Sequence, residues 1–388
     1  MGLITMNSLK KRRLAVGGFF FLTGLCFSSW ASRIPDFQVK FSLSEGQLGS
    51  LLLGMPLGSL LALPLAAWAV YKLGSRAVVL WGTSFYLFFL ITLGVANSGF
   101  QLALMVFVFG MMGNIMNISL NTQALGVEHD YGRSILSSFH GLWSFAGFAG
   151  AGLGALMVYL AVVPFFHYLI VFAVGLGVVL LFKGSIIREA NTKESSGGGL
   201  VLKKPDAILL RLGMVGFCGM MCEGCMFDWS GVYMAKVVQP AKQWIPLGYV
   251  AFMGAMATGR FIADKLATRW GKVTVLKGSG ILIFAGLLTS VMLPYFATVV
   301  TGFLLVGFGT AAVVPLTYSM AGRSSQYPPG IAIAMISTIS FFGFLLGPPL
   351  IGFIAELLHL KSSFALIGIM GAMITVLVSY KNQVFALK

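Results

Sequence analysis

The stretch Cys222-Glu223-Gly224-Cys225-Met226-Phe227-Asp228-Trp229-Ser230-Gly231-Val232-Tyr233 lies inside an otherwise apolar run over about residues 207–235. A run of this length can cross the ~30 Å hydrocarbon core of a bilayer as one helix, which needs about 20 residues. The stretch nevertheless carries two carboxylates, Glu223 and Asp228. An ionisable side chain at membrane depth costs at least ~2.5 kcal/mol by insertion scales, so it persists where it faces a cavity, a partner or a transported species. These two acids are therefore the first functional candidates.

The composition of the whole chain is that of a membrane-spanning protein. Of its 388 residues, 58% are hydrophobic and 10% are charged, whereas soluble domains carry about 25% charged residues. Apolar runs of about 20 residues recur along the chain, and the sequence lacks the short alternating segments of a membrane β-barrel. The 49 glycines favour close packing of helices within the membrane. We therefore predict an all-α membrane protein.

Apolar runs bounded by charges, Gly, Pro or Asn predict twelve spans. Their centres are expected near Leu22, Leu57, Leu87, Met112, Gly147, Phe172, Met221, Met253, Ile283, Gly307, Phe342 and Met370. The polar segment between the sixth and seventh spans is rich in Ser and Gly, which is typical of a flexible linker. The predicted organisation is an N-terminal six-helix bundle over residues 1–184, a cytoplasmic linker loop over 185–206 and a C-terminal six-helix bundle over 207–388.

The distribution of basic residues predicts the orientation. The net charge of +15 could indicate a nucleic-acid partner, but the basic residues are scattered through short loops, so no nucleic acid is expected. With a cytoplasmic N-terminus, five of the 26 Lys and Arg residues fall outside, which leaves 21 inside; the five are Arg33, Lys40, Lys236, Lys242 and Lys361. The positive-inside rule then puts both termini and the central loop in the cytoplasm.

Motifs of catalysis and metal binding give no support for an enzyme. Cys222 and Cys225 have the spacing of a redox or metal pair, but no second ligand pair exists in the sequence, so no metal site is predicted. No Walker sequence or HExxH motif is present. We expect neither an enzyme nor an organic cofactor.

The two halves of the sequence resemble each other at a nearly constant offset. The matches pair residues 144–148 with 340–344, 26–31 with 225–230, and Gly74 with Gly271, at offsets of 196, 199 and 197 residues. Three matches in the same order indicate a duplicated six-helix unit. Parallel repeats of this kind bracket a binding site near the membrane midplane.

A resemblance to a known family follows from this organisation and from one string. Twelve spans in two halves, a central loop and Gly259-Arg260-Phe261-Ile262-Ala263-Asp264-Lys265-Leu266-Ala267-Thr268-Arg269-Trp270-Gly271-Lys272 resemble the major facilitator superfamily (MFS) and its signature loop. Three further strings, Ala31-Ser32-Arg33-Ile34-Pro35, Ser138-Phe139-His140-Gly141-Leu142-Trp143-Ser144 and residues 223–230, resemble a bacterial inner-membrane branch near the fucose permeases. The resemblance covers nearly the whole chain. It implies a monomeric transporter of the bacterial inner membrane, whose two bundles rock about a midplane cavity.

The signature string is expected to form part of a gate. Asp264 is expected to end a helix at the cytoplasmic face, where Arg269 or Arg323 and a neighbouring helix N-terminus could hold its carboxylate. In the superfamily such contacts lock the cytoplasmic side shut. The resemblance thus implies gating roles for Gly259, Arg260, Asp264, Arg269 and Arg323. Ordinary positive-inside loop charge is the alternative.

The two intramembrane acids are expected to act separately, as the coupling groups for protons. Five residues on a helix correspond to ~7.5 Å of rise and ~140° of rotation, so Glu223 and Asp228 share a face only if a glycine breaks the helix. Glu223 lies nearest the midplane, where burial favours the neutral carboxyl and so predicts reversible protonation. Asp228 lies nearer the outside, at about the depth of Arg33. Arg33 could form an ion pair with Asp228 at the extracellular rim, where it would act as a gating residue, or its side chain could reach out to water.

Candidate substrate-binding side chains are amides, an imidazole and aromatic rings at similar depths. Asn114, Asn117 and Asn121 follow helical spacing on the fourth span, and His140 of the fifth span reaches about the depth of Asn114. These groups could bind substrate hydroxyls or hold helices together. The aromatic candidates, whose rings could stack on sugars or serve as anchors and packing groups, are Trp30, Trp143, Trp229 and Tyr233.

The sequence therefore predicts a secondary active transporter that moves a small polar solute by alternating access, in symport with protons. A sugar or sugar derivative is favoured, because amides and aromatic rings are present and no deep arginine cluster is expected to hold an anion. Proton-coupled export of an amphipathic or cationic compound is the alternative within transport. A non-transporting membrane sensor is the alternative of another class, although the loops are too short for a signalling domain.

Overall fold

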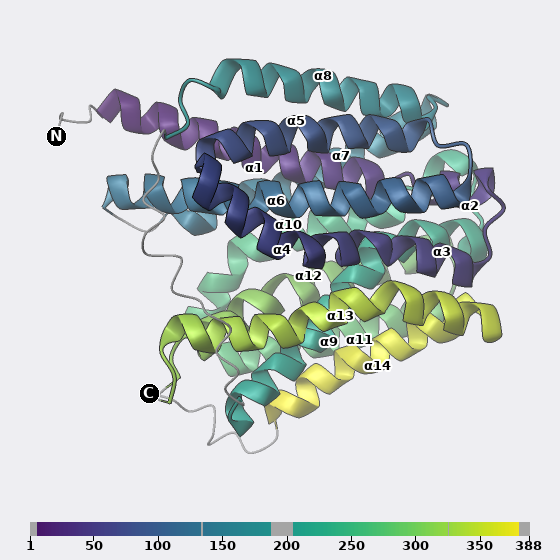
Figure 1. The fold of residues 1–388 in the computed structure, drawn as a ribbon. Helices are drawn as coiled ribbons and strands as arrows, with labels where there is room; N and C mark the ends of the chain where they lie inside the picture. The colour runs from purple at the N-terminus through teal and green to yellow at the C-terminus, as the bar shows by residue number, and fades with distance from the viewer. Residues whose placement is uncertain (1–5, 133–134, 188–204, 325, 380–388) are drawn as a thin grey trace. The chain divides into compact units, whose positions relative to one another are not determined.

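A computed structural model describes residues 6–132, 135–187, 205–324 and 326–379 (Figure 1). Within these residues the chain forms helices and turns, and no strand. The helices of the first half are α1 Met6–Ala31, α2 Ile34–Lys40, α3 Glu45–Leu52, α4 Gly54–Leu73, α5 Ser75–Gly94, α6 Gly99–Tyr131, α7 Leu136–Tyr159 and α8 Pro164–Phe182. Those of the second half are α9 Ala207–Tyr233, α10 Leu247–Trp270, α11 Lys272–Met292, α12 Phe296–Ala321, α13 Pro329–Leu357 and α14 Leu360–Ser379.

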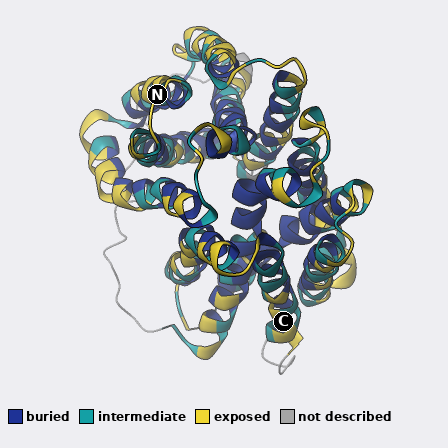
Figure 2. Ribbon diagram, turned by 90° about the vertical axis from the view of Figure 1, so that its right-hand side faces the viewer, coloured by how far each residue is buried: buried dark blue, intermediate teal, exposed yellow. Residues whose placement is uncertain are grey.

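Twelve helical segments in the described residues are long and apolar enough to cross a membrane. The surfaces of these helices are also apolar. Large apolar side chains such as Trp81, Leu181 and Ile281 are 65%, 76% and 56% exposed. In Figure 2 individual helices carry a buried side and an exposed side. An apolar exposed side is unfavourable in water and matches lipid. The predicted all-α membrane fold with twelve spans is therefore confirmed.

The chain forms two compact units, and their helices pair in the same way. Unit 1 comprises residues 1–36 and 51–197, and unit 2 comprises residues 37–50 and 198–388. In unit 1, α1 packs on α7, α4 on α6, and α5 on both α6 and α8. In unit 2, α9 packs on α13, α10 on α12, and α11 on both α12 and α14. This one-to-one correspondence confirms the duplicated six-helix bundle.

Two glycines make equivalent turns in the two units. Gly74 separates α4 from α5 with φ 78° and ψ 148°, and Gly271 separates α10 from α11 with φ 81° and ψ 148°. Residues that carry a Cβ disfavour this backbone conformation, so glycine is required at both turns. The helix before Gly271 runs through to Trp270, because no Gly or Pro interrupts residues 260–270. The expectation that Asp264 ends a helix is therefore wrong.

Residues 37–50, which the sequence placed in the N-terminal bundle, belong to unit 2. There the start of α3 packs on the end of α13. A Cβ added to Gly49 would lie 2.7 Å from the Pro348 carbonyl oxygen, and one added to Gly352 would lie 2.5 Å from the Glu45 carbonyl oxygen. Only glycine at both positions allows backbones to approach this closely.

Candidate functional site

The candidate site is built on α9, which is continuous from Ala207 to Tyr233. Asp206 caps its first turn, since the carboxylate Oδ1 accepts a hydrogen bond from Leu209 N at 2.7 Å, as an N-cap residue should. The helix packs against α12, α13 and α14, and residues 221–230 are all buried. Because the helix is unbroken, Glu223 and Asp228 project from different faces, about 140° apart.

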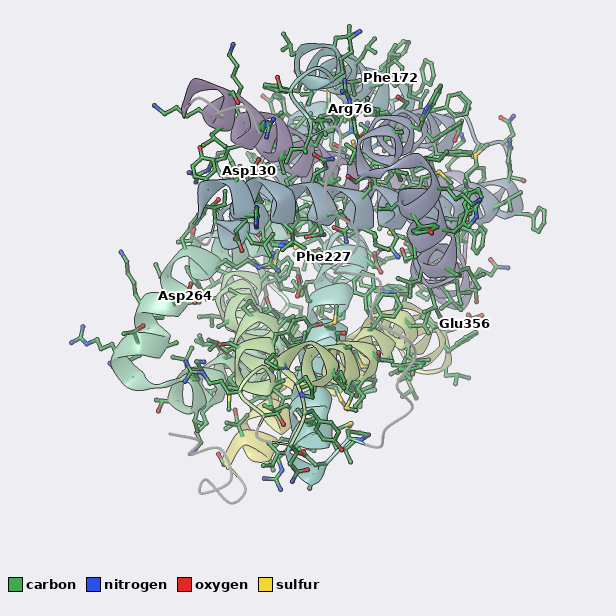
Figure 3. All side chains as sticks on the ribbon, turned by 60° about the vertical axis from the view of Figure 1, so that its left-hand side comes forward. Arg76, Asp130, Phe172, Phe227, Asp264 and Glu356 are labelled. Atoms are coloured by element: carbon green, nitrogen blue, oxygen red, sulfur yellow. The ribbon has the colours of Figure 1, made fainter. Side chains whose placement is uncertain are left out.

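The acidic stretch lies between the two ends of unit 2. Asp264 and Glu356 mark these opposite ends in Figure 3, and Phe227, the neighbour of Asp228, lies between them. Phe227, which neighbours Asp228 in the sequence, is therefore away from both labelled ends of the unit. That the two carboxylates lie at membrane depth stays a prediction.

Arg260 of α10 contacts Glu223 directly. Its Nη2 donates a hydrogen bond to Glu223 Oε1 at 2.9 Å, and the two side chains are 21% and 11% exposed. A charge-assisted hydrogen bond of this length is among the stronger polar contacts in a protein. One expectation is corrected: Arg260 does not lie at the end of its helix as part of a cytoplasmic gate, since it lies ten positions before the end of α10 and contacts Glu223. A deep arginine is thus present.

A hydroxyl side chain of a further helix lies near this ion pair. Tyr318 of α12 is half-buried and lies within electrostatic range of Glu223. The ion pair between α9 and α10 therefore has a polar neighbour on α12 of the same unit.

Asp228 has a different environment from Glu223. The residue is 7% exposed, and none of the ion pairs between described residues involves its carboxylate. Burying an unpaired charge is unfavourable. The site therefore favours either the uncharged form of this side chain or a cationic partner.

The aromatic candidates of α9 are buried. Trp229 is 0% exposed, and its Nε1 has no hydrogen-bond acceptor among the described residues. The Tyr233 hydroxyl donates to the Ser290 carbonyl at 2.8 Å, and its ring centroid lies 4.2 Å from that of Phe364. These contacts tie α9 to α11 and α14 inside unit 2. They favour helix packing over substrate binding for Tyr233.

The asparagines of α6 divide into two groups. Asn114 Nδ2 donates to the Ser59 carbonyl of α4 at 2.5 Å, so this amide holds two helices together. Asn121 Nδ2 donates to Asn117 Oδ1 at 2.9 Å. Asn117 is exposed and Asn121 half-buried. Of the three asparagines in the predicted polar stripe, Asn114 therefore holds helices together, whereas the other two remain accessible.

The remaining candidates of unit 1 also differ in exposure. His140 of α7 is exposed, and its ring meets that of Phe20 edge-on at a centroid distance of 5.3 Å. Trp143 is half-buried, 6.1 Å from the ring of Phe27. Trp30 is 1% exposed, as buried as its counterpart in the second half of the repeat. Two of these three side chains are thus accessible.

Arg33 is buried and has partners that were not expected. It is 2% exposed, its Nη1 lies 3.0 Å from Asp36 Oδ2, and its Nη2 donates to the Val162 carbonyl. The expectation that Arg33 reaches out to water is therefore wrong. Its pairing with Asp228 stays a prediction, because the two residues belong to different units.

The predicted gate contacts are only partly present. Gly259 marks a close approach of α10 to α12, since an added Cβ would lie 2.6 Å from the Ala311 Cβ. Asp264, Arg269 and Arg323 are exposed. Among the ion pairs of the described chain, none joins Asp264 to either arginine, which contradicts the expected latch. The reason is the continuation of α10 past Asp264.

Polar contacts at the start of α3 in unit 2 were not expected from the sequence. Ser44 Oγ donates to Glu356 Oε2 at 3.1 Å, and Lys236 Nζ lies 3.7 Å from Glu45 Oε1. We call these four residues the α3 clamp. The partners are far apart in sequence, so no local pattern signals them.

Comparisons with known proteins agree with this architecture. A family model described as Major Facilitator Superfamily matches residues 16–328 and 251–384. The uncharacterized transporter y4wD of Sinorhizobium fredii is 36% identical over 380 residues, which are 96% of this chain and 98% of that protein. An uncharacterized MFS-type transporter of Yersinia pestis is 32% identical over 354 residues, 90% of this chain and 91% of that protein.

Solved structures with low sequence identity share the fold. A nucleoside transporter, NupG, matches with a TM-score of 0.74 and 12% identity over 97% of this chain and 100% of its own. A D-xylose-proton symporter matches with a TM-score of 0.75 and 11% identity over 95% of this chain and 96% of its own. At such identities the likeness extends to the fold alone.

Proposed function

Because this chain belongs to the Major Facilitator Superfamily, we propose that it is a secondary transporter coupled to protons through Asp228 and Glu223. The observation that carries the proposal is a pair of buried carboxyl groups on α9 in unlike surroundings. Glu223 is bound by Arg260, whereas Asp228 is paired with no cation of the described chain. Two acids so differently stabilised bind protons at different points of a transport cycle.

Asp228 is the proposed entry point of the proton. Its carboxyl is buried without a counter-ion, so proton uptake removes an unfavourable charge. Glu223 responds differently, because a proton there would remove the negative charge that Arg260 Nη2 contacts. In our proposal this nitrogen then donates to the substrate. In this scheme alternating access follows the charge state of α9 and α10.

A small polar solute, with a sugar or sugar derivative favoured, is the proposed cargo. The accessible amides of Asn117 and Asn121 offer donors and acceptors suited to hydroxyl groups. Arg260 is one partly buried arginine and not the cluster that an anion site would need. Its charge is also balanced by Glu223, so an anionic solute has to compete with that carboxylate. A neutral solute does not.

A second candidate is proton-coupled export of an amphipathic or cationic compound. The observation that favours it is the same unpaired Asp228, which a cationic substrate could neutralise. For both candidates we propose a bacterial inner-membrane location with cytoplasmic termini. The support is the excess of basic residues on one side of the predicted topology.

The test is solute flux in proteoliposomes that hold the purified protein. An imposed pH gradient, acid outside, is combined with a panel of labelled sugars, sugar derivatives, nucleosides, amino acids and cationic dyes. We expect uptake of a neutral polar solute that collapses when a protonophore is added. Asp228→Asn should lose gradient-driven accumulation and keep substrate exchange. Asp206→Asn is the matched control on the same helix, because asparagine preserves the N-cap.

Three results would contradict the proposal. Binding without flux for every solute would indicate a sensor. Flux that ignores the pH gradient would remove the coupling. Full gradient-driven accumulation by Asp228→Asn would remove this residue as the entry point of the proton.

A further inference from the structure

A cavity of about 320 Å³ opens at the Asp264 end of unit 2, where the ends of α9, α10, α11 and α12 meet. It is lined by the apolar side chains of Leu212, Val273 and Met320 and by Gly271, Lys272 and Arg323. Its volume is at the lower end of ~300–1,000 Å³, the usual range for ligand pockets. The transport scheme above makes no use of it.

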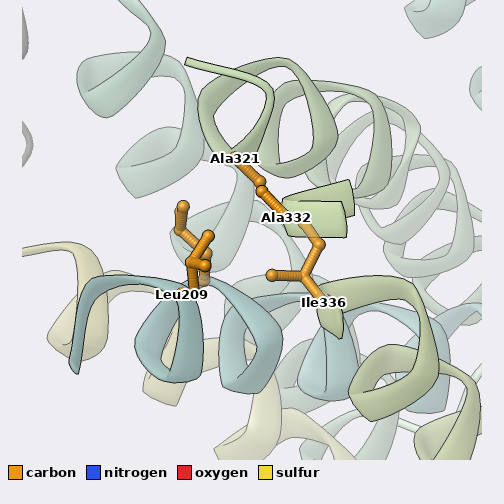
Figure 4. Close-up of a cluster of buried hydrophobic side chains, with 5 residues drawn as sticks. Leu209, Ala321, Ala332 and Ile336 are labelled. Atoms are coloured by element: carbon orange, nitrogen blue, oxygen red, sulfur yellow. The ribbon is translucent and has the colours of Figure 1, made fainter. Parts of the chain in front are cut away.

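A packed apolar cluster supports the floor of this cavity. Leu209 and Leu212 of α9 contact Ala321 of α12 and Ala332 and Ile336 of α13 in the interior of the unit (Figure 4). These residues are 0–1% exposed. Met320 and Val273, which line the cavity, pack against the same cluster. The apolar wall is therefore a fixed part of the fold.

The two cations at the cavity have no close counter-ion. Lys272 and Arg323 take part in none of the ion pairs between described residues. The Lys272 ammonium donates instead to Ser319 Oγ at 2.6 Å. Arg323 and Asp264 both lie within its electrostatic range. Two positive charges and one negative charge leave a single positive charge, which suits a monoanion.

We propose that this cavity binds the phosphodiester headgroup of an anionic membrane phospholipid. Lys272 and Arg323 hold the phosphate, and the first carbons of an acyl chain lie along Leu212, Val273 and Met320. Basic pockets between membrane helices at a leaflet surface have the charge that such headgroups require. The apolar wall distinguishes a lipid from free phosphate, which would gain nothing from it. The site requires only that this end of unit 2 meets a leaflet surface, whichever way the protein is oriented.

The test is native mass spectrometry of the delipidated, full-length protein titrated with lipid. Dioleoylphosphatidylglycerol is compared with dioleoylphosphatidylcholine, whose headgroup carries no net charge. We expect one saturable phosphatidylglycerol site. Its affinity should fall at least tenfold in Lys272→Gln/Arg323→Gln and should be largely retained in the single variant Lys272→Arg, which keeps both positive charges. Lys72→Gln/Lys265→Gln is the matched control, because it removes two exposed cations outside the cavity and should bind as the wild type does.

Two further experiments distinguish a bound lipid from a bound free phosphate. Both use the wild-type protein, so a misfolded variant cannot affect them. Inorganic phosphate and glycerol phosphate are added as competitors, and a photoreactive phosphatidylglycerol is cross-linked to the wild-type protein. We expect the free phosphates to displace no lipid and the cross-link to fall on residues 267–273 or 320–323. Displacement by phosphate alone, equal binding of both lipids, equal loss in the control variant, or cross-links confined to other segments would each overturn the proposal.

Discussion

Replacing either partner of the Glu223–Arg260 ion pair should destabilise unit 2 by a measurable amount. Unit charges about 4 Å apart attract by about 4 kcal/mol at an effective dielectric constant of about 20. Removing one partner of a buried pair costs about 3–5 kcal/mol, because the other charge stays buried and unpaired. Arg260 keeps 21% of its side chain exposed. We therefore expect about 3 kcal/mol for Glu223→Gln and for Arg260→Gln.

The assay is thermal melting of the purified variants in detergent. A change of 1 kcal/mol corresponds to about 2–4 °C for a unit of 150–250 residues, so each single variant should melt about 6–12 °C below the wild type. The double variant Glu223→Gln/Arg260→Gln leaves no buried charge unpaired. It should therefore melt at or above the temperature of either single variant, and it should not lose the ~6 kcal/mol expected if the two effects were independent.

A matched control lies on the same helix. Asp228→Asn removes a buried carboxylate that has no ion pair in the described chain, so its melting temperature should be unchanged or raised. A double variant as unstable as the sum of its single variants would refute the pair. So would single variants that melt with the wild type.

Three other predictions concern the packing of unit 2. Tyr233→Phe removes a buried hydrogen bond to α11 and should lower stability by about 1 kcal/mol; an unchanged melting temperature would contradict this. Gly271→Ala strains a backbone with φ 81° in open space and should cost about 1–3 kcal/mol, whereas Gly278→Ala, also in open space but helical, should be neutral or stabilising. Gly352→Leu forces α13 away from α3, so hydrogen exchange in residues 37–50 should accelerate about tenfold for each ~1.4 kcal/mol of strain; wild-type exchange rates there would contradict the close packing.

Much of the fold follows from local patterns that the sequence carries openly. Apolar runs of membrane length predict the spans, because lipid requires about 20 apolar residues in each. The nearly constant offset between the halves predicts the repeat, which the closely similar conformations of Gly74 and Gly271 bear out. Two further features could have been predicted from local signals. Residues 260–270 contain no Gly or Pro, which indicates that the helix continues past Asp264. The spacing of Arg33 and Asp36 suits an i,i+3 ion pair.

The contacts that matter most for the site are not readable from one sequence. Glu223 and Arg260 lie 37 residues apart on separate helices, and their meeting depends on how each helix is rotated about its axis. The same holds for Tyr233, whose hydroxyl could have faced a cavity and instead faces α11. In the α3 clamp, Ser44 and Glu356 lie 312 residues apart, and Glu45 and Lys236 also belong to distant segments. Helical periodicity predicts which residues share a face but not which neighbour that face meets.

The state of the Asp228 carboxyl is the central claim, and infrared spectroscopy of the reconstituted protein measures it directly. The C=O stretch of a protonated carboxyl is followed as the pH is raised, in the wild type, in Asp228→Asn and in Glu223→Gln. The account predicts a titrating band that disappears in Asp228→Asn and persists in Glu223→Gln. A band that persists in Asp228→Asn would contradict it.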